Sequence, residues 1–131
     1  MNPEVVTIGL GYIGLPTSAL IASKGTNVLG IDINQKIVDT INQGKIHIVE
    51  PDLEDIVYLA VQNGNLKASN KAKSAGVYLI VVPTPFKDNH EPDISFVEAA
   101  TMEIIPILKK GDLYIIESTS PLSLIHIWRC R

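Results

Sequence analysis

The chain has 131 residues, 46% of them apolar and 19% charged, which is enough for one domain with a buried core and too few for a second domain of ordinary size. Its formal net charge of −3 at pH 7 and its lack of a basic cluster argue against nucleic acid or an anionic membrane as a partner. No apolar run reaches the roughly 18 residues of a membrane-spanning helix, and the first residues lack the form of a signal peptide, so we expect a cytoplasmic protein.

Short apolar runs alternate with helical stretches along the chain, and glycines separate many of them. The apolar runs predict strands, at residues 5–10, 28–32, 66–69, 77–82 and 113–117. The stretches between them predict helices, near residues 13–24, 35–42, 52–62 and 93–108. Buried strands that alternate with helices are typical of a parallel sheet with helices on both faces. The predicted fold class is therefore α/β with a doubly wound parallel sheet.

The last ten residues break this pattern. A new apolar run starts after Pro121, and the chain stops without another element, so we expect the sheet domain of residues 1–121 to be C-terminally truncated. Residues 122–131 resemble translated read-through of a transposase-type sequencing adapter, and we interpret them as a non-native tail. We assign no role to His126 or to Cys130, which is the single cysteine and excludes an internal disulfide.

A glycine motif lies where the first predicted strand meets the first predicted helix. Gly9, Gly11 and Gly14 have the G-x-G-x-x-G spacing of a dinucleotide-binding loop. The first glycine permits a tight turn, the second leaves room for a pyrophosphate, and the third lets the helix pack closely on the strand. The N–H groups at the start of the helix would face the phosphate charge. The alternative is a tight turn that binds no ligand.

Asp32 favours the dinucleotide interpretation. It ends the second predicted strand, about twenty residues beyond the glycines, where a carboxylate can accept hydrogen bonds from the adenosine ribose. Its negative charge would repel a 2′-phosphate, so we expect NAD rather than NADP as the cofactor. Lys36 could soften this preference, but it falls in the following helix and is interpreted as a surface residue. These features predict a sheet of the Rossmann type.

Two polar segments follow later strands and are expected at the same carboxyl edge of the sheet, where open α/β folds bind ligands. Residues 82–85 place Thr84 between two prolines, and residues 117–121 supply a carboxylate and three hydroxyls, beginning with Glu117. The alternatives are a rigid turn for the first segment and a helix cap for the second.

Two histidines have acidic neighbours, which could suggest acid–base or metal chemistry. His47 lies near Glu50, and His90 precedes Glu91 and Asp93. Each histidine lies in a polar loop without a second ligand at helical spacing. We interpret both as surface or loop residues and predict no metal site.

Together these segments resemble the N-terminal domain of the UDP-glucose/GDP-mannose dehydrogenase family, from about residue 5 to residue 121. The sequences that carry the resemblance are GLGYIGLP at 9–16, DIN at 32–34, IHIVEPDL at 46–53, VPTPF at 82–86, HEPD at 90–93 and ESTSP at 117–121. The resemblance implies NAD contacts for four residues, which are Tyr12, Ile13, Asp32 and Thr84. It also implies that Glu117 and Thr119 lie beside the nicotinamide and the reacting carbon as supporting catalytic residues.

The resemblance further implies a four-electron oxidation of the C6 alcohol of a UDP-sugar to a carboxylate, with two NAD in succession, through a cysteine-bound thiohemiacetal. Segments 46–53 and 90–93 favour UDP-N-acetylmannosamine as substrate and its uronate, a precursor of surface polysaccharide, as product. UDP-glucose or another UDP-sugar is the alternative, because substrate choice lies mostly in later domains.

In the family, a helical dimerisation domain and a UDP-sugar domain follow, and the latter holds the nucleophilic cysteine and a catalytic lysine. Cys130 cannot replace that nucleophile, because it has no neighbouring base to lower its pKa and lies where the first domain is still being built. We therefore expect a homo-oligomeric parent enzyme and an inactive chain. An NAD-sensing module without catalytic activity is the alternative of another class, and the polar loops at 83–85 and 117–121 disfavour it.

Overall fold

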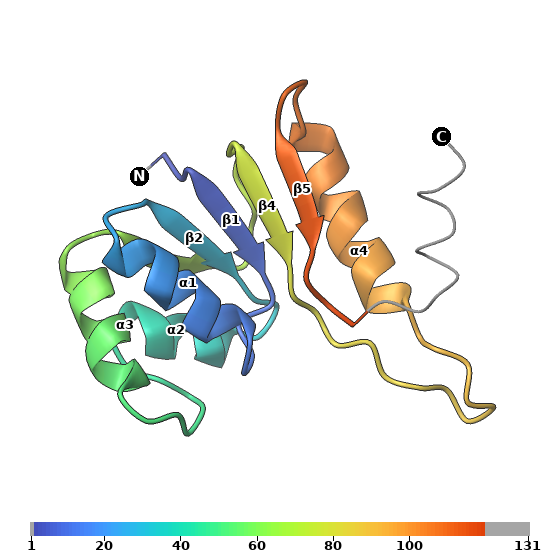
Figure 1. The fold of residues 1–131 in the computed structure, drawn as a ribbon, viewed down its shortest axis with the longest axis horizontal. Coiled ribbons are helices and arrows are strands. Elements are labelled where there is room, and N and C mark those ends of the chain that lie inside the picture. The colour runs from blue at the N-terminus through green and yellow to red at the C-terminus, as the bar shows by residue number, and fades with distance from the viewer. Residues whose placement is uncertain (1, 120–131) are drawn as a thin grey trace.

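The computed structural model describes residues 2–119, in which five strands form a wholly parallel sheet with helices on both faces (Figure 1). The strands are β1 Val5–Ile8, β2 Val28–Ile31, β3 Leu66–Ser69, β4 Val77–Ile80 and β5 Leu113–Ile116. Their order across the sheet is β3-β2-β1-β4-β5. The predicted Rossmann-type fold is confirmed, and each predicted strand is present.

The helices also lie where the periodicity predicts them. They are α1 Gly14–Ser23, α2 Gln35–Asn42, α3 Leu53–Gln62 and α4 Ser95–Ile104, with a short 3₁₀ turn, η1, at Ile105–Ile107. The helix expected to reach residue 108 keeps regular α geometry only to Ile104. Pro106 lies in the 3₁₀ turn, and proline has no N–H to donate to the preceding helical turn.

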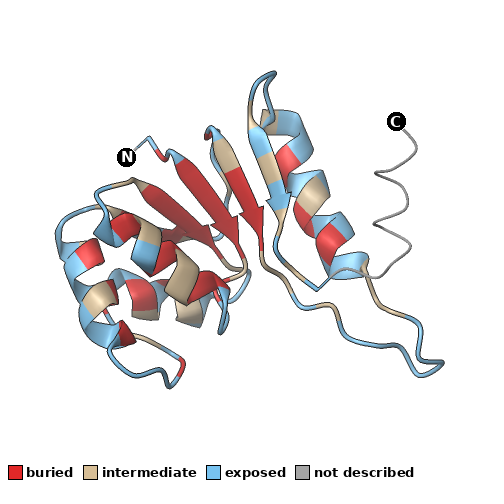
Figure 2. Cartoon of the chain, in the orientation of Figure 1, coloured by how far each residue is buried: buried red, intermediate tan, exposed pale blue. Residues whose placement is uncertain are grey.

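Alternate residues of the strands build two separate cores, one on each face of the sheet. Val5 of β1 packs in the core under α1, α2 and α3, while its neighbour Val6 packs in the core under α4. The central strands are buried on both faces, as Figure 2 shows. Their continuous apolar runs follow from this double burial.

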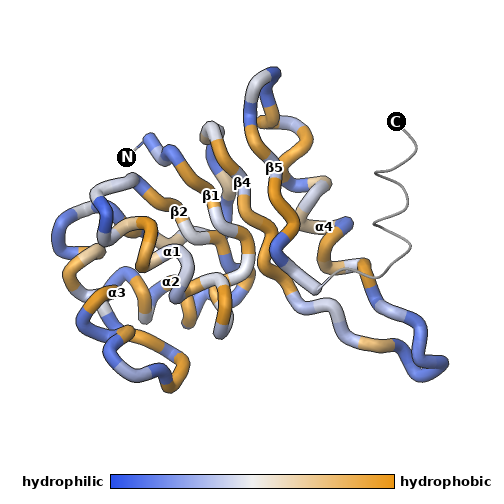
Figure 3. The backbone as a smooth tube through the Cα atoms, viewed as in Figure 1, coloured by the Kyte–Doolittle hydropathy of each residue, from blue (hydrophilic) through white to orange (hydrophobic). Residues whose placement is uncertain are grey.

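Strand β5 is covered on one face only. Tyr114 and Ile116 pack against the core on the α4 side, whereas Leu113 and Ile115 are exposed on the opposite face. Figure 3 shows how apolar β5 is, in contrast to the hydrophilic tip of the loop that leads from β4 to α4. In the described part of the chain, no helix covers the exposed face of β5. No helix of that part is long and apolar enough to cross a membrane.

The free edge of the sheet at β3 is partly closed by a side chain. The Asn42 amide donates to the Ala68 carbonyl oxygen at 2.9 Å and accepts from the Ala68 N–H at 2.8 Å. One side-chain amide therefore pairs with the edge strand as a neighbouring peptide would, which reduces the exposed pairing surface of that edge.

The position of the ligand site follows from the order of the strands. β1 pairs with β2 on one side and with β4 on the other, so the chain leaves the centre of the sheet in two directions. Ligands of open α/β sheets bind at the carboxyl ends of the strands where the order reverses in this way. The loops that follow β1, β4 and β5 meet at this point.

Candidate dinucleotide-binding site

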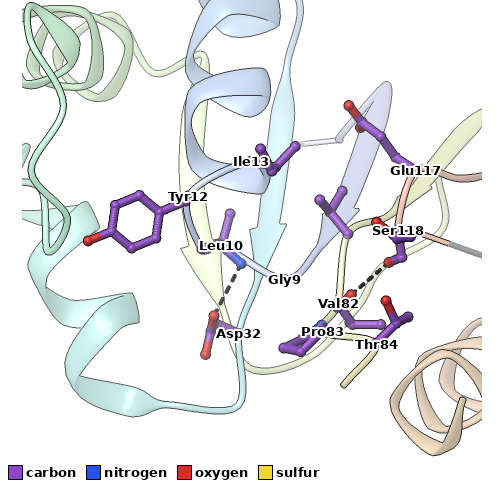
Figure 4. A pocket seen from close by; sticks show the side chains of 13 residues that line it. Gly9, Leu10, Tyr12, Ile13, Asp32, Val82, Pro83, Thr84, Glu117 and Ser118 are labelled. Carbon is purple, nitrogen blue, oxygen red and sulfur yellow. Dashed lines mark hydrogen bonds between the residues drawn. The ribbon is translucent and has the colours of Figure 1, made fainter. Parts of the chain in front are cut away.

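A cavity of about 490 Å³ opens at the carboxyl ends of β1, β4 and β5 (Figure 4). Its walls come from four segments that are far apart in the sequence. The lining residues are Gly9, Leu10, Gly11, Tyr12, Ile13, Asp32, Val81, Val82, Pro83, Thr84, Glu117, Ser118 and Thr119. Every residue predicted for the site lines this cavity except Gly14, which is buried where α1 packs on the backbone of Gly9.

The three glycines have three different surroundings. Gly9 has a φ of +98°, and a Cβ on it would lie 2.3 Å from the Val81 carbonyl oxygen. A Cβ on Gly14 would lie 1.8 Å from the Gly9 carbonyl oxygen, so the start of α1 can approach the β1 end only without a side chain there. A Cβ on Gly11 would meet no atom within 4 Å. The motif thus needs its outer glycines for the fold and leaves the middle one open to a ligand.

The start of α1 is suited to an anion. Its N-cap residue, Ile13, makes no side-chain capping hydrogen bond, and the first turn contains no acidic residue. The partial positive charge of a helix N-terminus is therefore not neutralised by the helix itself, and it faces the cavity beside Gly11. A pyrophosphate fits this combination of open space and free backbone donors.

Asp32 is held in place by the loop that it faces. One carboxylate oxygen accepts from the Leu10 N–H at 3.2 Å, and the other accepts from the Asn34 N–H at 2.9 Å. Each oxygen keeps a further lone pair for a ligand hydroxyl. Sequence reasoning missed the bond to Leu10, which joins the end of β2 to the glycine loop. Lys36 is exposed and does not line the cavity.

Two apolar side chains remain exposed at the start of α1. Tyr12 and Ile13 are 62% and 59% exposed, although both line the cavity. Figure 4 shows Tyr12 on one side of the cavity and Glu117 on the other. Exposed apolar side chains at the mouth of a cavity offer contact area to the flat or aliphatic parts of a ligand.

The loops after β4 and β5 form the other wall. Thr84 comes from the first loop, and the exposed residues Glu117 and Thr119 come from the second. The half-buried Ser118 lies between them and donates a hydrogen bond from its hydroxyl to the Val82 carbonyl oxygen at 2.7 Å (Figure 4). This link between the two loops was not predicted from the sequence.

The two histidines with acidic neighbours lie outside the cavity. His47 is exposed in the loop between α2 and α3, and His90 is exposed near the tip of the loop between β4 and α4. At the end of that loop, hydrogen bonds from the side chain and backbone of Ser95 hold the pKa of Asp93 below its ordinary value. Within residues 2–119, no three His, Cys, Asp or Glu side chains cluster as metal ligands would.

Comparison with known proteins identifies the family of this chain. Residues 3–126 match the model of the UDP-glucose/GDP-mannose dehydrogenase family, NAD binding domain. The chain belongs to this family. The predicted family and its cofactor, NAD, are thereby confirmed, whereas the predicted domain end at Pro121 and the tail of residues 122–131 lie outside the described residues.

Curated relatives match nearly the whole chain. UDP-N-acetyl-D-mannosamine dehydrogenase of Yersinia pestis is 58% identical over 123 residues, which are 93% of this chain and 29% of the relative. The NDP-N-acetyl-D-galactosaminuronic acid dehydrogenase of Ralstonia nicotianae is 56% identical over 118 residues, 90% of this chain and 28% of the relative. The chain therefore spans less than a third of the length of these relatives.

Solved structures of the family have the same fold. The UDP-N-acetyl-mannosamine dehydrogenase of Staphylococcus aureus superposes with a TM-score of 0.89 at 41% identity, over 95% of this chain and 31% of that one. The corresponding enzyme of Pyrococcus horikoshii superposes with a TM-score of 0.88 at 36% identity, over 94% of this chain and 30% of that one.

Proposed function

We propose that this chain is the NAD-binding part of an enzyme that oxidises UDP-N-acetylmannosamine to UDP-N-acetylmannosaminuronate. The main support is the cavity, which collects the predicted residues of three loops at the reversal point of a sheet of this family. The relatives of about 58% identity that are named UDP-N-acetyl-D-mannosamine dehydrogenases support the choice of substrate.

In the proposed complex, the pyrophosphate of NAD lies against the start of α1. Gly9 and Gly14 shape the turn, and Gly11 leaves the space that the phosphates enter. The backbone N–H groups at this uncapped helix start donate to the phosphate oxygens. Tyr12 and Ile13 contribute exposed apolar surface on the same side of the cavity.

Asp32 would bind the adenosine ribose. Its two oxygens are already oriented by the Leu10 and Asn34 N–H groups, so the ribose hydroxyls meet a carboxylate that needs little reorganisation. Its negative charge disfavours a 2′-phosphate at the same place, which is the physical basis for NAD over NADP.

The nicotinamide end of the cavity would lie between Thr84 and the pair Glu117 and Thr119. NAD supplies the hydride acceptor, and two molecules in succession remove the four electrons that separate an alcohol from a carboxylate. Thr84 and Thr119 can donate and accept hydrogen bonds, and Glu117 adds a carboxylate next to the sugar carbon that reacts. These side chains would orient the two reactants relative to each other.

The identity of the sugar is the part of the proposal that this domain supports least directly. The relative from Ralstonia nicotianae, named for an N-acetylgalactosaminuronic acid, is almost as similar as the mannosamine enzymes. UDP-glucose or another UDP-sugar is therefore the second candidate. An NAD sensor is disfavoured, because polar side chains of two loops face the cavity at the end opposite Tyr12.

The full-length protein that contains this domain tests the proposal. Purified protein is mixed with NAD and, in separate reactions, with UDP-N-acetylmannosamine, UDP-N-acetylgalactosamine and UDP-glucose, and NADH is followed by absorbance. We expect two NADH per UDP-N-acetylmannosamine consumed and the uronate as product. A higher kcat/KM for another UDP-sugar would contradict the proposed substrate. NAD binding without oxidation of any of the three UDP-sugars would support the NAD sensor.

We propose further that the full-length enzyme is cytoplasmic and homo-oligomeric. Cell fractionation would test the location, and light scattering would test the oligomeric state.

A further inference from the structure

Beyond the end of the sheet, a side chain continues the pairing between β4 and β5. The last paired residues of the two strands are Ile80 and Ile116. The N–H groups of Glu117 and Ser118 then both donate to the Ile80 carbonyl oxygen, at 2.9 and 3.1 Å. The Ser118 hydroxyl reaches further, to the Val82 carbonyl oxygen at 2.7 Å, and lies 3.3 Å from the Ile80 carbonyl oxygen.

Two contacts hold the start of the segment 82–84. The side chain of Val82 packs against the core under α4, and the backbone of the segment accepts the hydrogen bond from Ser118. Pro83 has no N–H and cannot donate a hydrogen bond, so the segment has few groups with which to anchor itself. Among residues 2–119, the bond from Ser118 to the Val82 carbonyl oxygen is the single hydrogen bond that holds residues 82–84. The next anchor along the chain is the bond from the Asp93 N–H to the Pro85 carbonyl oxygen at 2.7 Å.

The hydroxyl of Ser118 serves the loop rather than the ligand. Figure 4 shows it directed at Val82, while the side chain of its neighbour Glu117, which lines the cavity, points away from Val82. A serine hydroxyl has one proton to donate, and here that proton goes to a backbone carbonyl. Ser118 therefore joins the loop that carries Thr84 to the loop that carries Glu117 and Thr119.

We infer that Ser118 is a positioning residue for the nicotinamide end of the site. It sets the separation between Thr84 on one loop and Glu117 and Thr119 on the other, without contacting NAD or the sugar itself. This inference rests on the proposed function, since it assumes that a nicotinamide and a reacting carbon lie between these loops. The adenosine, ribose and pyrophosphate contacts belong to other segments and do not depend on Ser118.

The test uses the full-length enzyme and two ligands that differ only at the nicotinamide. ADP-ribose shares the adenosine, pyrophosphate and ribose of NAD but lacks the nicotinamide. For Ser118→Ala, we expect the Kd of NAD measured by calorimetry to rise about 3- to 10-fold, as one lost hydrogen bond allows, while the Kd of ADP-ribose changes less than about twofold. We expect kcat to fall roughly 10- to 100-fold, because a small displacement of groups around the reacting atoms is costly.

Two further variants separate positioning from general loss of stability. Ser118→Thr keeps the hydroxyl and should recover most of kcat. Ser23→Ala removes a bond of the same type and length, from Ser23 to the Leu20 carbonyl oxygen at 2.7 Å, at the exposed end of α1. It should leave both Kd values and kcat unchanged.

The outcomes distinguish the two proposals. Wild-type Kd values and kcat in Ser118→Ala would overturn the role of Ser118, and so would a parallel loss of affinity for NAD and ADP-ribose with a lower Tm. If the wild-type enzyme oxidises no UDP-sugar, the proposed function fails instead. The comparison of NAD with ADP-ribose then still decides whether Ser118 positions the loop at the nicotinamide.

Discussion

Replacing Gly11 by alanine should separate NAD binding from folding. A Cβ at this position meets no atom within 4 Å, and the φ of Gly11 lies outside the left-handed region, so alanine introduces neither a clash nor backbone strain. The free energy of unfolding should stay the same or rise by up to about 1 kcal/mol, because alanine restricts the unfolded chain. The new methyl group, however, stands where we place the pyrophosphate.

The expected loss of affinity can be estimated from steric crowding. Forcing an extra methyl group into a filled site costs about 1–3 kcal/mol, which corresponds to a Kd for NAD roughly 5- to 150-fold higher. Calorimetric titration of the full-length protein with NAD measures this value, and thermal unfolding without NAD measures the stability. Unchanged affinity would refute the position of the pyrophosphate, and a clear loss of Tm would refute the open surroundings of Gly11.

Gly14→Ala is the matched comparison, because the same methyl group has the opposite surroundings. Its Cβ would lie 1.8 Å from the Gly9 carbonyl oxygen and 2.9 Å from the adjacent carbonyl carbon, both of which are backbone atoms. The helix must move away from β1, so we expect a loss of about 3 kcal/mol or more in stability even without ligand. A Gly14→Ala protein with wild-type Tm would contradict the close approach of α1 to the loop.

Three other substitutions test the contacts around the site and the sheet. Asp32→Ala should raise the Kd of NAD about 10- to 100-fold, because the ribose loses a charged acceptor and the Leu10 N–H loses its partner. An unchanged Kd would exclude Asp32 from the ribose site. Asn42→Ala should lower the free energy of unfolding, measured by urea denaturation, by about 1–2 kcal/mol, since two backbone groups of β3 lose their partner. An unchanged free energy of unfolding would show that water replaces the amide. Thr7→Val should raise the free energy of unfolding by about 1 kcal/mol, because the hydroxyl of Thr7 is buried without a hydrogen-bond partner in the described structure. A less stable variant would indicate that the hydroxyl has a partner such as a buried water.

The sequence predicts the elements of this fold well because their signals are local. The run of residues 66–69 and the helix of residues 35–42 are predicted with the observed bounds, since periodicity and flanking turn residues lie within a few positions of each element. The strands expected at 5–10 and 77–82 end earlier, at Ile8 and Ile80, and the last two residues of each apolar run belong to the loops that line the cavity.

The candidate residues could be predicted for a related reason. A glycine motif at a strand–helix junction and polar segments after later strands lie at one edge of any parallel sheet, whatever its detailed geometry. Tyr12, Thr84, Glu117 and Thr119 accordingly meet in one cavity. Their individual roles toward NAD and the sugar remain predictions, as do the end of the domain and the origin of residues 122–131.

By itself, the sequence determined the order of strands and helices, the glycine motif, the carboxylate that follows it and the family. The tertiary structure alone decided which distant groups meet: the Leu10 N–H with Asp32, 22 residues away, and the Val82 carbonyl with Ser118, 36 residues away. It also decided that Asn42 closes the edge at β3, 26 residues along the chain. Turn and helix signals arise between residues that are near neighbours in the sequence. These contacts depend instead on which strands pair and in what register, and a single sequence does not encode that pairing in any local pattern.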